Sequence, residues 1–500
     1  MFRRTIRFVA KTVAVVTVAS GAGVLLAKYV MDSMHHSVGI EKPTKKQLEE
    51  ENQDNHALFR YLPELKRKIA WRQLGNYPTP IHRGTYNYIS KDHGTARFYV
   101  KREDLSSPYY GGNKVRTLQH QLAVCEAKDA TKKIYVTGTG GSNQIIATIV
   151  HGYHRLKLNV CPIWMQKDVP DLDNTLNMLS TLSFHSSEIT SWADGFAMFQ
   201  TMLSGILGSS SFFLPPGGNN PAGVLGQVGG LLELAEQIQN KEVPDPDGIF
   251  VAMGSSCTVS GLIIGVALCE HMNLNVFQSK EFKVHGVPIH DGIAGANRSM
   301  NFFKASWSQY IPLSIRHTIQ STCNELKKAG GPDLTEMALH VFETQVVIHD
   351  DEDVVGIYGG HSTISKNVAV QYDSIDDSIK DINGKSQKPL WLCGHFTAKA
   401  FTHMIEELKK DQTKDFIFWQ TKSALQPLGP EDEWSKLKNL PDEIKVWANE
   451  GKSESIRRPG HVDTKHGNSM DYRHLMTKVD DALSIDNNNT QGFSKTSSRM

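Results

Sequence analysis

Short hydrophobic runs alternate with longer segments of helical periodicity between about residues 61 and 448. Residues 134–137 form a β-branched run that predicts a strand, glycines follow, and the apolar residues of 145–150 recur at helical spacing. The pattern repeats over 248–269, and further strands are predicted at 159–165, 283–289, 389–393 and 416–420. This alternation predicts an α/β fold with mostly parallel sheets and helices on both faces. Binding sites in such folds gather at the carboxyl ends of the strands.

Composition narrows the classes of function. The chain has 500 residues, is 39% hydrophobic, and can bury one large core or two modest ones. It carries 54 Lys and Arg against 53 Asp and Glu, with no basic stripe among aromatic residues, so we expect no nucleic-acid partner. The six cysteines include no CxxC pair, which indicates neither a zinc site nor a disulfide framework and fits a reducing compartment.

The two ends differ from the rest of the chain. Residues 1–45 carry four basic residues among the first eleven and no acidic residue before Asp32. This segment fits a mitochondrial transit sequence, and a membrane anchor or a secretory signal is the alternative. Its uncharged run, 12–27, is short for a membrane-spanning helix, which needs roughly 20 apolar residues. Residues 451–500 are polar and predict a disordered tail.

Two glycine-rich turns each lie between a predicted strand and a predicted helix. In "GTGGSNQ" (138–144), Ser142 or Asn143 can cap the helix start, where free amides favour an anion. An ordinary tight turn explains this stretch equally well. It is not a dinucleotide fingerprint, because Asn143 replaces the third glycine of GxGxxG. In "GSSCTVSG" (254–261), hydroxyls and successive amides form a nest suited to phosphate. Together the turns suggest the carboxylate end and the phosphate end of one ligand.

The stretch "YYGGNKVR" (109–116) places Lys114 after two glycines and an asparagine. Taken alone, Lys114 reads as a solvated surface cation. Beside glycines that allow close backbone approach, a desolvated lysine is instead a nucleophile that can bind an aldehyde. His151 and His154 lie at helical spacing, but no third ligand is apparent, so we expect no metal site.

Taken together, these stretches resemble the pyridoxal-phosphate (PLP) enzymes of the tryptophan-synthase β fold (fold type II). Within them they resemble the branch of 1-aminocyclopropane-1-carboxylate (ACC) deaminases and D-cysteine desulfhydrases. "KREDLSSPYYGGNKVRTLQHQL" (101–122) is similar to that branch's KRED…GGNKxRKLE stretch. Further similar stretches follow in order: "GGSNQ" (140–144), "LPPGGNNPAGVLG" (214–226), "GSSCTVSG", "GIYGGHS" (356–362), "FTAKAFTHMIEEL" (396–408) and "IFWQTKSA" (417–424). The resemblance implies a catalytic domain over 46–450 with two α/β subdomains, the smaller at about 117–212.

The resemblance also implies roles for individual residues. Lys114 would bind PLP covalently, and its freed amine would exchange protons with the substrate's α-carbon. Asn143 would hold the phenolic oxygen of PLP, and Thr421 would face the pyridine nitrogen. The phosphate-loop residues would be Ser255, Ser256, Cys257 and Thr258. The substrate-binding residues would be Ser142, Asn143, Gln144, Tyr358 and Thr397, with Ser142 and Tyr358 also catalytic.

Several positions depart from the branch's pattern. Phe396 replaces the tyrosine of YxGKA, Ser256 and Cys257 replace glycines of the phosphate loop, residues 420–423 replace HTGG, and Thr117 replaces the second cation of KxRK. Small hydroxyl residues at Thr397 and Thr421 are typical of the D-cysteine type. We therefore expect a PLP-dependent lyase that deaminates a small amino acid by β-elimination, most like D-cysteine desulfhydrase, and a homodimer. The alternatives are a catalytically impaired PLP-fold protein with a binding role, or an ACC deaminase.

Overall fold

A computed structural model gives the structure of the chain. It describes residues 38–89, 93–164, 172–184, 211–289, 301–349, 351–356, 359–423, 425–429, 442–451 and 469–470. Residues 1–37 of the predicted targeting segment and most of the predicted tail lie outside these ranges, although β12 (Ser469–Met470) pairs with β11 (Gln426–Pro427). Among the described residues, no helix has the length and apolar character needed to cross a bilayer.

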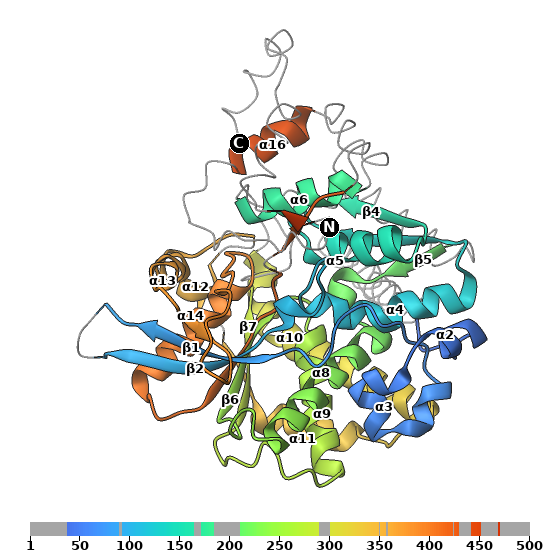
Figure 1. Cartoon of the computed structure of the whole chain (residues 1–500), viewed down its shortest axis with the longest axis horizontal. Coiled ribbons are helices and arrows are strands. Elements are labelled where there is room, and N and C mark those ends of the chain that lie inside the picture. Colours follow the sequence, from blue (N-terminus) through green and yellow to red (C-terminus); the bar gives the residue numbers. More distant parts are fainter. Residues whose placement is uncertain are drawn as a thin grey trace, which may run out of the picture.

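The larger of two main sheets has seven strands in the order β8-β7-β6-β10-β2-β1-β9 (Figure 1). Its five neighbouring strands from β8 to β2 are parallel, while β1 pairs antiparallel with both β2 and β9. The strands are β1 (Ile81–Asn87), β2 (Thr95–Lys101), β6 (Gly248–Met253), β7 (Lys283–Pro288), β8 (Val346–Ile348), β9 (Ile379–Lys380) and β10 (Phe416–Trp419). The predicted α/β architecture with mostly parallel sheets is confirmed.

Central strand β6 explains how the larger sheet is covered on both faces. Every residue of β6 is buried, which is typical of a parallel strand with helices on either side. Ile249 and Val251 belong to the core under α8, α9, α10 and α11, whereas Phe250 and Ala252 belong to the core under α13 and α14. These helices are α8 (Pro221–Gln239), α9 (Cys257–His271), α10 (Asn301–Lys328), α11 (Thr335–Gln345), α13 (Thr363–Asp373) and α14 (Thr397–Lys410).

The smaller sheet has three parallel strands in the order β4-β3-β5, which Figure 1 shows beside the larger sheet. Its strands are β3 (Lys133–Gly138), β4 (Val160–Trp164) and β5 (Ser211–Leu214). A separate core joins it to α4 (Asn113–Asp129), α5 (Asn143–Thr148), α6 (Leu172–Phe184) and α16 (Asp442–Gly451). Helix α5 continues as a π-helical turn, Ile149–Arg155. The short helices α2 (Lys45–Glu50), α3 (Ala57–Tyr61) and α12 (Glu352–Val355) complete the described α-helices.

The strand predicted at 389–393 is wrong. Residues 390–393 are buried, but their backbone groups bond to side chains instead of a neighbouring strand. Leu390 N donates to the Tyr372 hydroxyl (3.0 Å), and Cys393 N donates to Thr397 Oγ1 (2.8 Å). An apolar run of five residues cannot distinguish a buried strand from a buried irregular segment when side chains satisfy its backbone.

Candidate active site

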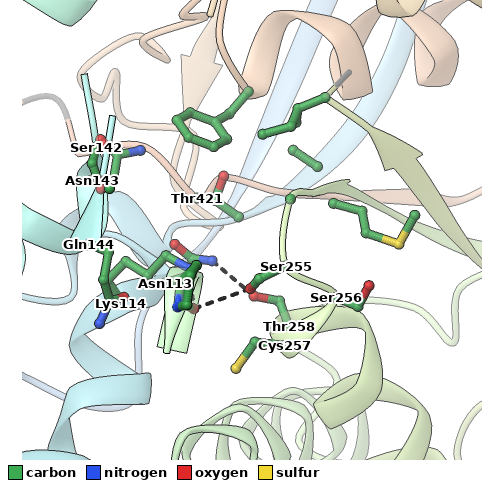
Figure 2. Close-up of a pocket in the computed structure, with 18 of the residues that line it drawn as sticks. Asn113, Lys114, Ser142, Asn143, Gln144, Ser255, Ser256, Cys257, Thr258 and Thr421 are labelled. Atoms are coloured by element: carbon green, nitrogen blue, oxygen red, sulfur yellow. Dashed lines mark hydrogen bonds between the residues drawn. The ribbon is translucent and has the colours of Figure 1, made fainter. Parts of the chain in front are cut away.

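A cavity of about 200 Å³ lies where the two sheets face each other, at the carboxyl ends of β3 and β6 and the starts of α4, α5 and α9 (Figure 2). Predicted site residues from distant parts of the sequence line it together. They are Lys114, Ser142, Asn143, Gln144, Ser255, Ser256, Cys257, Thr258 and Thr421. The two glycine-rich turns therefore border the same cavity.

The two glycines before Asn113 are required by close backbone contacts. A Cβ on Gly111 would lie 2.1 Å from the Asp104 carbonyl oxygen, and one on Gly112 would lie 2.5 Å from that of Thr421. Gly112 also has a φ of +99°, which side-chain-bearing residues rarely adopt. The chain thus turns tightly against two neighbouring segments and begins α4 with Lys114 directed into the cavity.

A buried ionic network holds the start of α4 in place. Arg116 donates to both oxygens of Glu103 (2.6 and 2.8 Å) and to Glu233 of α8 (2.9 Å). Lys101, at the end of β2, bonds to the same Glu233 oxygen (2.5 Å). Burial acts to raise the pKa of Glu233, but Arg116 and Lys101 outweigh it and hold this pKa at about 2. The KRED stretch and Arg116 therefore position the lysine two residues earlier.

Lys114 has the properties of a nucleophile. Its side chain lines the cavity and is partly buried, and its amine donates to the Gly217 carbonyl (2.8 Å). Burial lowers the pKa of Lys114, and the nearby Cys257 thiol partly opposes this shift. A lowered pKa raises the fraction of neutral amine near pH 7, which is the reactive form.

The first turn presents polar groups to the cavity at the start of α5. Ser142 caps this helix by accepting from Ile145 N (3.3 Å). Gln144 is 2% exposed, and neither atom of its amide has a hydrogen-bond partner. A buried polar group without a partner costs free energy, so Gln144 indicates a polar ligand in this part of the cavity.

The second turn forms an anion site at the start of α9. The first intrahelical bond runs from Ser260 N to Ser256 O, which leaves the amides of residues 257–259 available. The Ser255 hydroxyl donates to Gly217 O (3.2 Å), and that of Thr258 accepts from Asn113 (2.9 Å). Figure 2 shows both hydroxyls near Asn113, whereas the Cys257 thiol points away from them.

The two residues that replace glycines in this turn behave differently. Ser256 adopts a left-handed conformation with φ +67°, the type that glycine adopts without strain. The Cys257 thiol bonds to Gly218 O (3.5 Å) and lies 3.8 Å from Thr117 Oγ1, so it does not fill the nest. Burial raises the pKa of Cys257, which keeps this thiol neutral.

The remaining predicted residues have separate outcomes. Phe396 lines the cavity, and its ring stacks on His395 with centroids 4.0 Å apart. Thr397 lies outside the lining: its hydroxyl donates to Trp391 O (2.9 Å) and accepts from Cys393 N. The structure thus does not bring Thr397 into the site. Tyr358 lies outside the described residues.

Three buried residues behind the cavity were missed as site residues. Tyr110 and Asn177 both donate to Asn143 Oδ1 (2.9 and 2.8 Å), and Lys422 bonds to both of them. The asparagines at 174 and 177, three residues apart on α6, were a signal, because buried polar residues at helical spacing need partners.

Comparison with known proteins matches residues 72–354 to the family model described as pyridoxal-phosphate dependent enzyme. A putative ACC deaminase of Pyrococcus horikoshii is 31% identical over 36% of this chain and 54% of its own length. A putative ACC deaminase of Thermotoga maritima is 24% identical over 69% of this chain and 93% of its own. D-cysteine desulfhydrase of Salmonella paratyphi C is 27% identical over 40% of this chain and 60% of its own. The chain thus spans just over half the length of the first and third of these relatives.

Among solved structures, an ACC deaminase homologue is 20% identical and superimposes with a TM-score of 0.49. The superposition covers 73% of this chain and 94% of the homologue.

Proposed function

The chain belongs to the family of pyridoxal-phosphate dependent enzymes, and on this basis we propose that it is a lyase that deaminates a small amino acid by β-elimination. Its cofactor is PLP. We propose D-cysteine, or a close β-substituted analogue, as the substrate. The observation that carries this proposal is the enclosed Lys114 amine between two helix starts that can each receive an anion.

The cavity residues fit PLP. The free amides at the start of α9, with the hydroxyls of Ser255 and Thr258, suit the phosphate. Lys114 supplies the amine for the aldehyde, and Phe396 offers a flat apolar face. Thr421 would face the ring nitrogen as a neutral hydroxyl. The unpartnered Gln144 amide, with Ser142, is suited to a substrate carboxylate.

When bound, PLP withdraws electrons from the substrate's α-carbon and so acidifies its proton. Lys114 is the base that takes this proton at Nζ, because its lowered pKa raises the fraction of neutral amine. Ser142 and Gln144 orient the substrate by its carboxylate, and the apolar side chains of Met253, Ile289 and Phe396 limit access of water. The overall reaction converts cysteine and one water to pyruvate, ammonia and hydrogen sulfide.

The titratable groups of the lining favour elimination of sulfur over opening of a cyclopropane ring. Among the described lining residues, only Lys114 and Cys257 titrate, and the Cys257 thiol points away from the cavity. The sulfur of cysteine leaves as the hydrosulfide anion, and sulfur anions are stable near neutral pH, as the cysteine thiol pKa of about 8.5 indicates. A carbon leaving group needs a proton or charge delivered to it, and Phe396 lacks the hydroxyl of the branch's tyrosine.

The test compares substrates on one PLP-loaded preparation. Sulfide and pyruvate are measured with D-cysteine and L-cysteine, and 2-oxobutanoate is measured with ACC. We expect sulfide release from D-cysteine and little or no 2-oxobutanoate, with both lost in Lys114→Ala. Faster turnover of ACC would contradict the proposed substrate. Failure on every β-substituted amino acid, with PLP still bound, would favour a binding role without turnover.

A further inference from the structure

A buried lysine, Lys422, lies behind the cavity at a position where the related branch has a glycine. It is 1% exposed, and its ammonium donates to Asn177 Oδ1 (2.7 Å) and to the Tyr110 hydroxyl (3.2 Å). The same ammonium lies 5.4 Å from the Tyr110 ring centre and 5.5 Å from that of Trp391. Because Lys422 is shielded from solvent, its hydrogen bonds and its charge act on neighbouring protein groups.

The ammonium fixes the direction of its hydrogen bonds to Tyr110 and Asn177, because it can only donate. The Tyr110 oxygen must therefore accept from Lys422, and its single hydrogen is left for Asn143 Oδ1 (2.9 Å). Burial raises the pKa of Tyr110 well above its usual range, so this hydrogen is retained. Likewise, Asn177 must turn Oδ1 toward Lys422 and Nδ2 toward Asn143 (2.8 Å).

Tyr110 and Asn177 each donate a hydrogen bond to the same atom of Asn143. Tyr110 and Asn177 converge on Oδ1, which forces the Asn143 amide to direct Nδ2 the other way. Asn143 lines the cavity, so this orientation presents a hydrogen-bond donor to a ligand there. Without the lysine, Tyr110 could turn its hydrogen to Asn177 Oδ1 (3.5 Å), and Asn143 Oδ1 would keep only the Asn177 donor, whose orientation the Gly141 carbonyl also fixes (2.8 Å).

We propose that Lys422 is a positioning residue that acts through Tyr110 to keep the Asn143 amide donor directed at the bound cofactor. This inference deepens the proposed function, because it assumes that Asn143 contacts the phenolic oxygen of PLP. A donor at that oxygen stabilises its anionic form.

The test measures PLP affinity by quenching of tryptophan fluorescence in wild type, Lys422→Met and Tyr110→Phe. We expect each change to weaken PLP binding about tenfold, the size of a lost hydrogen bond to a charged group. The midpoint of the pH titration of the bound cofactor's visible absorbance should also rise, because the phenolic oxygen loses its donor. Tyr110→Phe removes only a hydroxyl and guards against misfolding of Lys422→Met.

Asn143→Ala separates positioning from general stability. In that background Lys422→Met should change PLP affinity by less than about twofold, because the residue through which it acts is gone. Tyr88→Phe is the matched control: it removes a partly buried hydroxyl bonded to Ile405 O (2.7 Å) and should leave affinity unchanged. Equal effects of Lys422→Met with and without Asn143, or no shift of the titration midpoint, would overturn the inference. Failure to turn over D-cysteine would contradict the proposed reaction and leave this result standing.

Discussion

Neutralising Glu103 tests whether the buried ionic network holds the start of α4. Glu103 and the Arg116 side chain are 0% and 4% exposed, and two bonds of 2.6 and 2.8 Å join them. With Lys101 and Glu233 the network contains two cations and two anions, so Glu103→Gln leaves one uncompensated buried positive charge. Removing one partner of a buried pair costs about 3–5 kcal/mol. The amide keeps an acceptor for Arg116, so we expect the lower end, about 3 kcal/mol.

The assay is urea unfolding of the cofactor-free protein, with PLP affinity measured in parallel. Glu343→Gln is the control, since its pair with Arg316 (2.9 Å) is similar in chemistry but 52% and 39% exposed. The control should cost at most about 1 kcal/mol. PLP affinity should fall only in Glu103→Gln, because Arg116 lies two residues from Lys114. A loss below about 1 kcal/mol in Glu103→Gln would refute the reasoning.

Three further predictions concern single groups. The pKa of Glu233 is held at about 2, against an ordinary value of about 4.5. The stability that this carboxylate contributes is therefore present above pH 4.5 and should be lost as the pH falls toward 2. A urea unfolding midpoint that stays constant over this pH range would contradict the prediction. Ser256→Gly relieves the strain of the left-handed backbone conformation at this position, at a smaller cost in backbone entropy. The free energy of unfolding should therefore rise by up to about 1 kcal/mol. A decrease would show that Ser256 is not strained. The rate at which PLP attaches to Lys114, measured by borohydride trapping, should rise with pH because only the neutral amine reacts. The midpoint of this rise should lie below 10.5, the ordinary pKa of lysine. A midpoint at or above that value would argue against a desolvated amine.

Much of the fold follows from local pattern. The runs at 134–137, 283–289 and 416–420 became β3, β7 and β10, because a β-branched or apolar run next to a glycine turn and a periodic helix has few other solutions. The strand predicted at 389–393 did not form, since the backbone amides of 390 and 393 bond to side chains and not to a neighbouring strand. The antiparallel pairing of β1 with β2 was not predicted either.

The candidate site, too, could be predicted from the sequence only in part. Its glycine turns and Lys114 could be recognised, because their chemistry lies within a few consecutive residues. The contacts of Lys422 could not, since Tyr110 is 312 residues away and Asn177 is 245 residues away in sequence. Thr397 was expected in the site, but its hydroxyl bonds to the backbone of residues 391 and 393 at the start of its own helix.

Borohydride reduction of the PLP-loaded protein, followed by peptide mapping, tests the central claim most directly. The wild-type protein should carry the reduced cofactor on Lys114, and Lys114→Ala should carry none while keeping its fold. Lys422, a second buried amine near the cavity, should remain unmodified in both. Reduced cofactor on Lys422 or on any lysine other than 114, or trapping that survives in Lys114→Ala, would contradict the account.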